Sequence, residues 1–216
     1  MNFKWSYWTF KSEFSQKFCD DVLRLGKSLE KKHLVKAITG GDNIKWQDLS
    51  EEQQKNVQNK RQSDVIWLEE QWIYNTVLHY VREANHRAGW NVQWDWCESC
   101  QFTKYSKGQF YGWHCDSHSE PYKKEKGKNL AGKIRKLSAT ISLTDPNEYE
   151  GGNLEFDFRN QVDWENNKNI AMRECTEIRP RGSIVVFPSF MWHRVKPVLR
   201  GTRYSLVFWC AGHPWR

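Results

Sequence analysis

The chain has 216 residues, of which 38% are hydrophobic and 27% charged, and its formal net charge is +7. This balance fits one globular domain and excludes a largely disordered chain. The positive charge favours an anionic partner, but the lysines are scattered, so nucleic-acid binding is not the favoured interpretation. The sequence shows no signal peptide and no membrane span, and we expect a cytoplasmic protein with reduced cysteines.

The first part of the chain has helical periodicity. Residues 12–34 and 64–89 carry apolar side chains at spacings of three and four, which predicts two amphipathic helices. Ser12 and Asp64 are the predicted N-caps, and Gly89 stands where a C-terminal glycine is expected. The polar stretch between the helices is predicted to be a loop with one short helix at its middle.

From about Val92 the apolar period changes from 3.6 towards two. Six short β-prone runs bounded by turn residues follow: 90–105, 136–146, 151–158, 182–188, 191–198 and 202–210. Several strands with no helices between them predict an α+β, mainly β fold, an antiparallel sandwich or barrel with the helices packed outside. We expect 1–90 to be an N-terminal helical support region of the same domain and 91–216 to be its β core.

The stretch YGWHCDSHSE, residues 111–120, concentrates side chains that bind metals. His114 and Asp116 are two residues apart, so on a strand they point to the same face and can converge on one ion. A second imidazole must come from elsewhere, and His193 on a late strand is the best candidate. Two histidines and one carboxylate form the facial triad of non-haem Fe(II) oxygenases, which leaves three coordination positions open.

Other possible ligands compete with this set. Cys115 lies between the two ligands and points to the opposite face of the strand. His118 and Glu120 have the right parity, but the basic sequence after them suggests that the strand has ended. Cys97 and Cys100 resemble half of a zinc site, yet on an extended strand they face opposite ways. We therefore interpret these cysteines as packed or idle thiols.

A second buried charge is predicted on the last strand. Residues 200–201 are typical of a hairpin turn, so the strand after them should lie antiparallel beside the strand that carries His193. Arg203, Ser205 and Trp209 then share the inner face. A buried arginine needs a partner, which is either a protein carboxylate or a bound ligand carboxylate near the metal.

Three ordered segments resemble a known family: YSKGQFYGWHCD, RKLSATISLTDPNEYEGGNLEF and RPRGSIVVFPSFMWHRVKPVLRGTRYSLVFW. They are similar to the Fe(II)- and 2-oxoglutarate-dependent dioxygenases, in the prolyl 4-hydroxylase-like branch with its bacterial and phage relatives. The resemblance covers about half of the chain. It implies a double-stranded β-helix, a jelly-roll or cupin-like core with the iron at its open end, and a bacterial or phage source.

The family's functional residues can be carried over to matching positions. The resemblance implies that three residues bind Fe(II): His114, Asp116 and His193. It implies that three residues bind 2-oxoglutarate: Arg203, which pairs with the distal carboxylate, Tyr105 and Ser205. Tyr111 and Trp209 match aromatic positions near the substrate, and core packing would explain both equally well.

The implied activity is hydroxylation of a prolyl residue or a similar amino-acid side chain, with release of succinate and CO2. The implied cofactors are Fe(II), 2-oxoglutarate and O2, with ascorbate as a candidate reductant. The same chemistry on a nucleic-acid base or nucleoside is the alternative. A catalytically inactive binding module is disfavoured because every expected ligand is present. Segments 117–135 and 159–177 are expected to flank the open end and to select the substrate.

Overall fold

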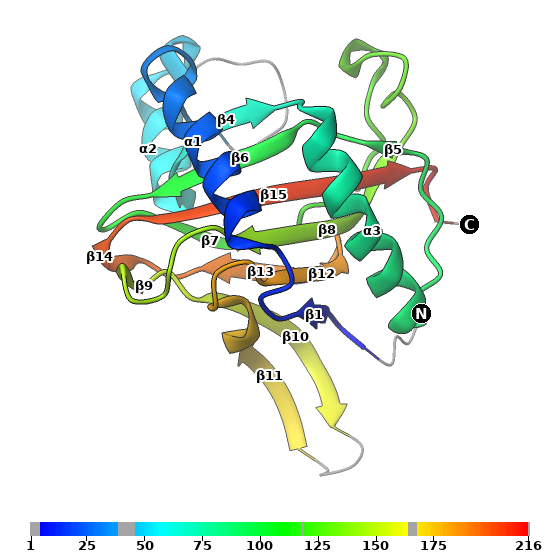
Figure 1. Ribbon diagram of the computed structural model, residues 1–216. Coiled ribbons are helices and arrows are strands. Elements are labelled where there is room, and N and C mark those ends of the chain that lie inside the picture. Colours follow the sequence, from blue (N-terminus) through cyan, green and yellow to red (C-terminus); the bar gives the residue numbers. More distant parts are fainter. Residues whose placement is uncertain (1–4, 39–45, 118, 164–167, 216) are drawn as a thin grey trace.

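The structure is a computed structural model that describes residues 5–38, 46–117, 119–163 and 168–215. Two antiparallel sheets form its body, with helices on one side (Figure 1). The helices are α1 (Gln16–His33), α2 (Glu51–Lys60) and α3 (Gln71–Arg87), with short 3-10 turns at Trp46–Asp48, Lys124–Lys126 and Thr176–Ile178. No described helix combines the length and the hydropathy that a membrane crossing requires.

The larger sheet has eight strands among the described residues. Its order is β1 (Trp8–Phe10), β12 (Ile184–Pro188), β8 (Ile134–Ser142), β15 (Arg203–Gly212), β6 (Cys100–Tyr105), β4 (Asp64–Leu68) and β2 (Val35–Lys36), with β5 (Trp96–Cys97) beside the end of β15. Its outer face packs against α1 and α3 through an apolar core that includes Val22, Val77 and Ile141.

The smaller sheet lies opposite the inner face of the larger one. Its order is β11 (Lys168–Glu174), β10 (Leu154–Asp163), β13 (Trp192–Val195), β7 (Phe110–His114) and β3 (Arg61–Gln62), and β9 (Tyr149–Gly151) pairs separately with β14 (Val198–Gly201). A second core between the sheets includes Phe156, Phe187 and Val195. Two sheets around one inner core confirm the predicted fold class, with strands from the first 90 residues joining both sheets.

Both predicted helix starts were wrong. Ser15 caps α1 by accepting a hydrogen bond from the Phe18 N–H. Ser12 instead has a positive φ of 53° and donates its backbone N–H to Ser183 Oγ, which ties it to the turn before β12. Residues 64–68 form strand β4 and not the first turns of a helix, because a short apolar run fits either period and here pairs with β6.

The predicted neighbour of the last strand was also wrong. β15 pairs with β6 and β8 in the larger sheet, whereas β13 pairs with β10 and β7 in the smaller one. Pro197 lies between β13 and β14, and β14 ends at Gly201, which has a φ of 75°. Arg203 therefore reaches the metal region from the sheet opposite His193.

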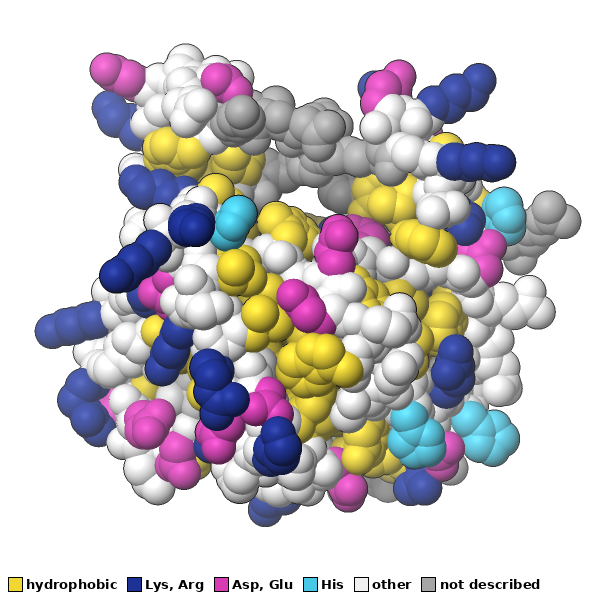
Figure 2. Space-filling model, turned by 45° about the horizontal axis from the view of Figure 1, so that its top comes forward, with side chains coloured by type: hydrophobic (Ala, Val, Ile, Leu, Met, Phe, Trp, Pro, Cys, Tyr) yellow, Lys and Arg dark blue, Asp and Glu magenta, His cyan; other side chains and the backbone are white. Residues whose placement is uncertain are grey.

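Charged side chains are mixed on the face that Figure 2 shows. Lysine and arginine alternate with aspartate and glutamate there and do not gather into one basic patch. The polar segment 159–177 falls largely in the β10–β11 hairpin, which projects from the body in Figure 1.

Candidate metal centre

Three side chains meet where β7 ends and β13 begins. His114 is the last residue of β7 and lies directly opposite His193 in the register of β13. Asp116 follows two residues later, and its backbone N–H donates to the Ser189 carbonyl at 2.8 Å, which fixes the turn. The ligand atoms of the three residues all lie within 4.8 Å of one another, so one ion can contact all of them.

Hydrogen bonds orient both imidazoles. His114 Nδ1 lies 2.8 Å from the Gly112 carbonyl, and His193 Nδ1 lies 2.9 Å from the Met191 carbonyl. A carbonyl can only accept, so each Nδ1 carries a proton, and in the neutral ring the lone pair is then on Nε2. The Nε2 atoms face Asp116, at 3.8 Å for His114 and 3.7 Å for His193. This backbone support is typical of metal-binding histidines.

The protonation states suit a divalent cation. Burial, together with the nearby His193, lowers the pKa of His114 to about 3. Burial alone would raise the pKa of Asp116, but His193, His114 and Arg135 outweigh it and lower the pKa to about 2. At neutral pH His114 is therefore neutral and Asp116 is ionised, which is the form that a metal needs.

This donor set fits Fe(II). Two imidazole nitrogens and one carboxylate oxygen are the ligands of non-haem iron sites with open positions. Over the described ranges of the chain, no second group of three histidine, cysteine or acidic side chains comes this close together. Cys115 and the Cys97–Cys100 pair are not part of the group, and His118 lies outside the described residues.

One narrow cavity lies over this cluster, with a volume of about 40 Å³. Every candidate site residue from the sequence lines it: Tyr105, Tyr111, His114, Asp116, His193, Arg203, Ser205 and Trp209. These residues come from both sheets. Arg203, Ser205 and Trp209 all line the cavity, as the predicted alternation along β15 requires. Thr140, Leu154, Val195 and Val207 complete the lining.

Arg203 is a buried cation in this cavity. Its side chain is 2% exposed, and its Nη1 donates to Ser205 Oγ at 3.3 Å. Within the described part of the chain, Arg203 forms no ion pair with an aspartate or glutamate. The centroid of the Tyr105 ring lies 5.5 Å from its guanidinium carbon. Ser142, opposite Ser205 in register, also has a buried hydroxyl oxygen without a hydrogen-bond partner there. A buried guanidinium with no acidic partner among the described residues fits a ligand carboxylate.

Tyr111 packs on a candidate metal ligand. Its ring lies over the His114 imidazole with centroids 3.4 Å apart, and the Arg61 guanidinium covers its other side at 4.4 Å. Arg61 is held by Ser63 Oγ at 2.8 Å and by Gln101 Oε1 at 2.7 Å. The sequence did not single out Arg61, because it ends a polar stretch that predicts a loop.

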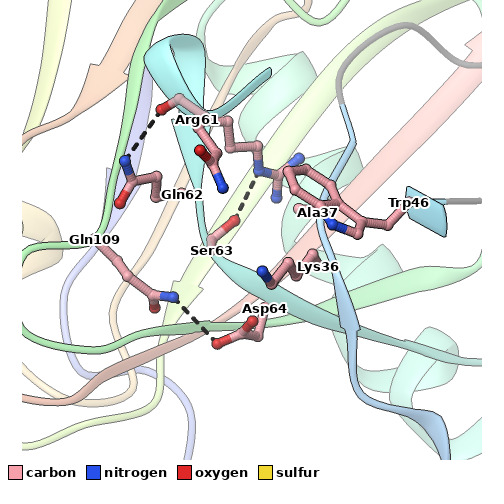
Figure 3. Close-up of a pocket in the computed structure, with 9 residues that line it drawn as sticks. Lys36, Ala37, Trp46, Arg61, Gln62, Ser63, Asp64 and Gln109 are labelled. Carbon is pink, nitrogen blue, oxygen red and sulfur yellow. Dashed lines mark hydrogen bonds between the residues drawn. The ribbon is translucent and has the colours of Figure 1, made fainter. Parts of the chain in front are cut away.

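Arg61 also borders a second cavity of about 290 Å³ between β2, α2 and β3. Figure 3 shows its bond to Ser63 on one wall and the Gln109–Asp64 hydrogen bond on another. Lys36 Nζ lies 4.8 Å from the Trp46 ring at the same cavity. Arg61 and Tyr111 thus separate this polar cavity from the candidate metal centre.

Trp209 forms the opposite wall. The guanidinium of Arg135 lies 3.9 Å from its ring centroid, and the Trp67 ring lies 6.1 Å away. The buried indole N–H of Trp209 helps to lower the pKa of Asp116. It makes no hydrogen bond of normal geometry among the described residues. Glu98 holds Arg135 through two hydrogen bonds, at 2.7 and 2.6 Å.

A β-bulge explains why the sequence did not indicate Arg135. Strict alternation along β8 places Arg135 with Leu137 on the outer face. The pairing with β15 shifts from Cys210–Leu137 to Ala211–Arg135, so Lys136 is the extra residue. Beyond the bulge, Arg135 faces Trp209 in the cavity wall.

We expect Glu98→Ala to lower the free energy of unfolding by about 3 kcal/mol, because it leaves the Arg135 charge buried without its partner. The side chains of this pair are only 15% and 11% exposed. Glu150→Ala is the matched control: its partner Arg200 is 60% exposed, and the loss should not exceed about 1 kcal/mol. Urea unfolding measures both, and equal losses would contradict the prediction.

Gly152 supports Arg203 from behind. Its φ is +61°, and a Cβ there would lie 2.9 Å from Arg203 Cδ and 3.0 Å from Val198 Cγ2. We expect Gly152→Ala to displace Arg203 and to raise the 2-oxoglutarate concentration for half-maximal binding several-fold. Gly132→Ala is the control, since Gly132 has a φ of +76° with nothing within 4 Å. Calorimetric titration should show weaker binding only for Gly152→Ala; unchanged affinity would contradict this support.

Solved structures share the fold. A prolyl-4-hydroxylase from Pseudomonas putida matches with a TM-score of 0.64 and 17% identity, over 96% of this chain and 92% of its own. A prolyl hydroxylase from Trichoplax adhaerens, solved with a hypoxia inducible factor peptide fragment, matches with a TM-score of 0.65 and 15% identity, over 95% and 83%. These similarities confirm the jelly-roll fold.

Sequence comparison supplies the family. A PKHD-type hydroxylase of Xanthomonas campestris is 34% identical over 109 residues, which are 50% of this chain and 41% of the relative. One from Bordetella pertussis is 31% identical over 109 residues, with the same coverage, so the match spans less than half the length of either relative. Residues 100–211, just over half of the chain, match the family described as the 2OG-Fe(II) oxygenase superfamily. With its histidine–aspartate–histidine cluster and its jelly-roll core, the chain belongs to this superfamily.

Proposed function

We propose that the protein is a dioxygenase that hydroxylates a prolyl residue or a similar amino-acid side chain in a peptide or protein. The observation that carries the proposal is Arg203, a buried cation with no acidic partner among the described residues, in the cavity that also contains His114, Asp116 and His193. The names of the similar proteins, PKHD-type hydroxylase and prolyl hydroxylase, support this choice of reaction.

Membership of the superfamily implies Fe(II), 2-oxoglutarate and O2. When bound, they supply oxidative decarboxylation to succinate and CO2 together with transfer of one oxygen atom to the substrate. In the proposal His114, Asp116 and His193 would hold the iron through two imidazole Nε2 atoms and one carboxylate. Three protein ligands would leave coordination positions for the cosubstrate and O2. Ascorbate is proposed as the external reductant that keeps the iron ferrous.

Arg203 orients the cosubstrate in this proposal. Its guanidinium forms a two-pronged, charge-assisted pair with the distal carboxylate, which sets the distance of the other end from the metal. Ser205 and Tyr105 add hydroxyl groups beside it, and both line the cavity. Because Arg203 lies on β15 and the histidines lie on the smaller sheet, a cosubstrate held by both would contact the two sheets.

The primary substrate is proposed to contact Tyr111 and Trp209. These rings stand on opposite sides of the cavity, and Arg61 and Arg135 back them from outside. The wall is therefore aromatic with a buried positive charge behind each ring. It suits a compact side chain such as a proline ring, which can pack against the two aromatic rings.

Labelled oxygen tests the proposal. The protein is loaded with Fe(II) without air, mixed with 2-oxoglutarate, ascorbate and a peptide library, and exposed to 18O2. We expect succinate in proportion to a peptide product that gains one labelled oxygen atom. Label in added oligonucleotides or nucleosides would instead move the substrate to nucleic acid. No succinate under any of these conditions would refute an oxygenase function.

A further inference from the structure

Two cysteines outside the candidate metal centre face each other. Cys97 on β5 and Cys210 on β15 are direct partners in the antiparallel register, and their Sγ atoms are 3.3 Å apart. The neighbouring Glu98 N–H donates to the Trp209 carbonyl at 3.0 Å, so Cys97 and Cys210 occupy a position between ladder hydrogen bonds. Residues at such positions have Cα atoms about 4.5 Å apart, within the range that a disulfide spans.

The two thiols differ in access. Cys97 is half-buried, whereas Cys210 is fully buried. Burial raises the pKa of Cys210 well above its ordinary value, and the contact with Cys97 raises it further. A reagent from solution therefore meets Cys97 first, and Cys210 stands behind it as the second thiol. This order is typical of a reactive cysteine with a resolving partner.

We propose that Cys97 and Cys210 form a reversible disulfide when the protein meets a small-molecule disulfide such as oxidised glutathione. The Cys97 thiolate attacks one sulfur of the oxidant, forming a mixed disulfide and releasing one glutathione thiolate. The Cys210 thiol then attacks the Cys97 sulfur and passes its proton to the departing glutathione sulfur, so the second glutathione leaves as a thiol. Two protein thiols are oxidised, one oxidant disulfide is reduced, and two glutathione thiols leave.

The cross-link would act at the wall of the metal cavity. Cys97 precedes Glu98, which holds Arg135, and Cys210 follows Trp209, on which Arg135 stacks. The bond joins positions 113 residues apart in sequence, and β5 itself has only two residues. Closing so long a loop restricts the unfolded chain, so the oxidised protein should unfold at a higher temperature than the reduced one.

Mass spectrometry of the full chain tests this assignment. Reduced protein is incubated with oxidised glutathione, denatured in an alkylating reagent, digested and mapped. We expect free thiols to fall from the six cysteines of the sequence to four, with one cross-link between Cys97 and Cys210. Dithiothreitol should restore all six thiols and reverse the rise in unfolding temperature.

Variants separate the roles of the two thiols. Cys210→Ser should accumulate glutathione on Cys97, because the resolving thiol is absent, and Cys97→Ser should form neither adduct nor cross-link. Cys19→Ser, at a buried position in α1, should still form the cross-link. Cys97 is half-buried, so we expect Cys97→Ser to fold. This variant therefore tests the proposal even if Cys210→Ser does not fold. The proposal would be overturned if the treated wild type kept six free thiols, retained a glutathione adduct on Cys97, or formed a cross-link to Cys100.

Discussion

Replacing His114 by alanine is expected to abolish iron binding and succinate formation and to leave the fold intact. The imidazole supplies one of three proposed ligands, and its ring is otherwise in contact with Tyr111 at the cavity wall. Loss of a group that hydrogen-bonds to a metal ligand typically lowers the metal affinity about 10–100-fold, so loss of the ligand itself should lower the affinity by more than about 100-fold. Iron content after anaerobic loading measures this effect, and circular dichroism checks the fold.

His33→Ala is the matched control for this substitution. His33 is an exposed histidine in the last turn of α1, and its replacement should leave the iron content at the wild-type value. If His114→Ala bound iron with wild-type stoichiometry and affinity, His114 would not be a ligand. A second variant, Asp116→Ala, should behave like His114→Ala because the carboxylate is the only anionic donor in the cluster.

Replacing Arg203 by methionine is expected to weaken 2-oxoglutarate binding roughly 10- to 100-fold. A hydrogen bond to a charged group contributes about 1.5–3 kcal/mol, and each 1.4 kcal/mol is a factor of ten. Iron binding should be unchanged, since Arg203 is not a metal ligand in the proposal. Titration of the iron-loaded protein with 2-oxoglutarate, without air, measures the dissociation constant.

The stability of Arg203→Met gives an independent check. Without ligand, Arg203 is a buried charge that forms no ion pair among the described residues. The variant, which has a neutral side chain of similar length there, should therefore unfold at the same temperature as the wild type or at a higher one. Wild-type protein should be stabilised by 2-oxoglutarate, and the variant should not. Arg200→Ala, at an exposed position of β14, should behave as wild type in both assays. A variant that loses stability without ligand would show that Arg203 has a protein partner.

The local part of the site was predictable because strand geometry has a period of two. Arg203, Ser205 and Trp209 share a face of β15 for this reason, and they line one cavity with His114 and Asp116. The strand β7 ends at His114, however, and Asp116 reaches the cluster from the turn that its hydrogen bond to the Ser189 carbonyl fixes. Cys115, which lies between them, is not in the ligand cluster. Alternation does not specify which strand becomes a neighbour, so the sheet to which β15 belongs was predicted wrongly.

Three features needed the structure. The run of apolar residues in β4 is too short to separate a strand from a helix, so Trp67 was placed on the wrong element. Arg135 reaches the Trp209 ring only because a bulge interrupts the alternation of β8. Arg61 ends a polar stretch, and its role follows from a contact with Tyr111 made across β3 and β7. Irregular pairing and contacts between distant segments leave little signal in one sequence.

The most direct test of the proposed site is visible absorption during anaerobic addition of 2-oxoglutarate to the Fe(II)-loaded protein. If the histidine–aspartate cluster holds iron and Arg203 positions the cosubstrate, a weak charge-transfer band should appear and saturate at one 2-oxoglutarate per iron. The band should need far more 2-oxoglutarate in Arg203→Met and should be absent in His114→Ala. Iron-loaded wild-type protein that develops no band at saturating 2-oxoglutarate would contradict the assignment of this cavity.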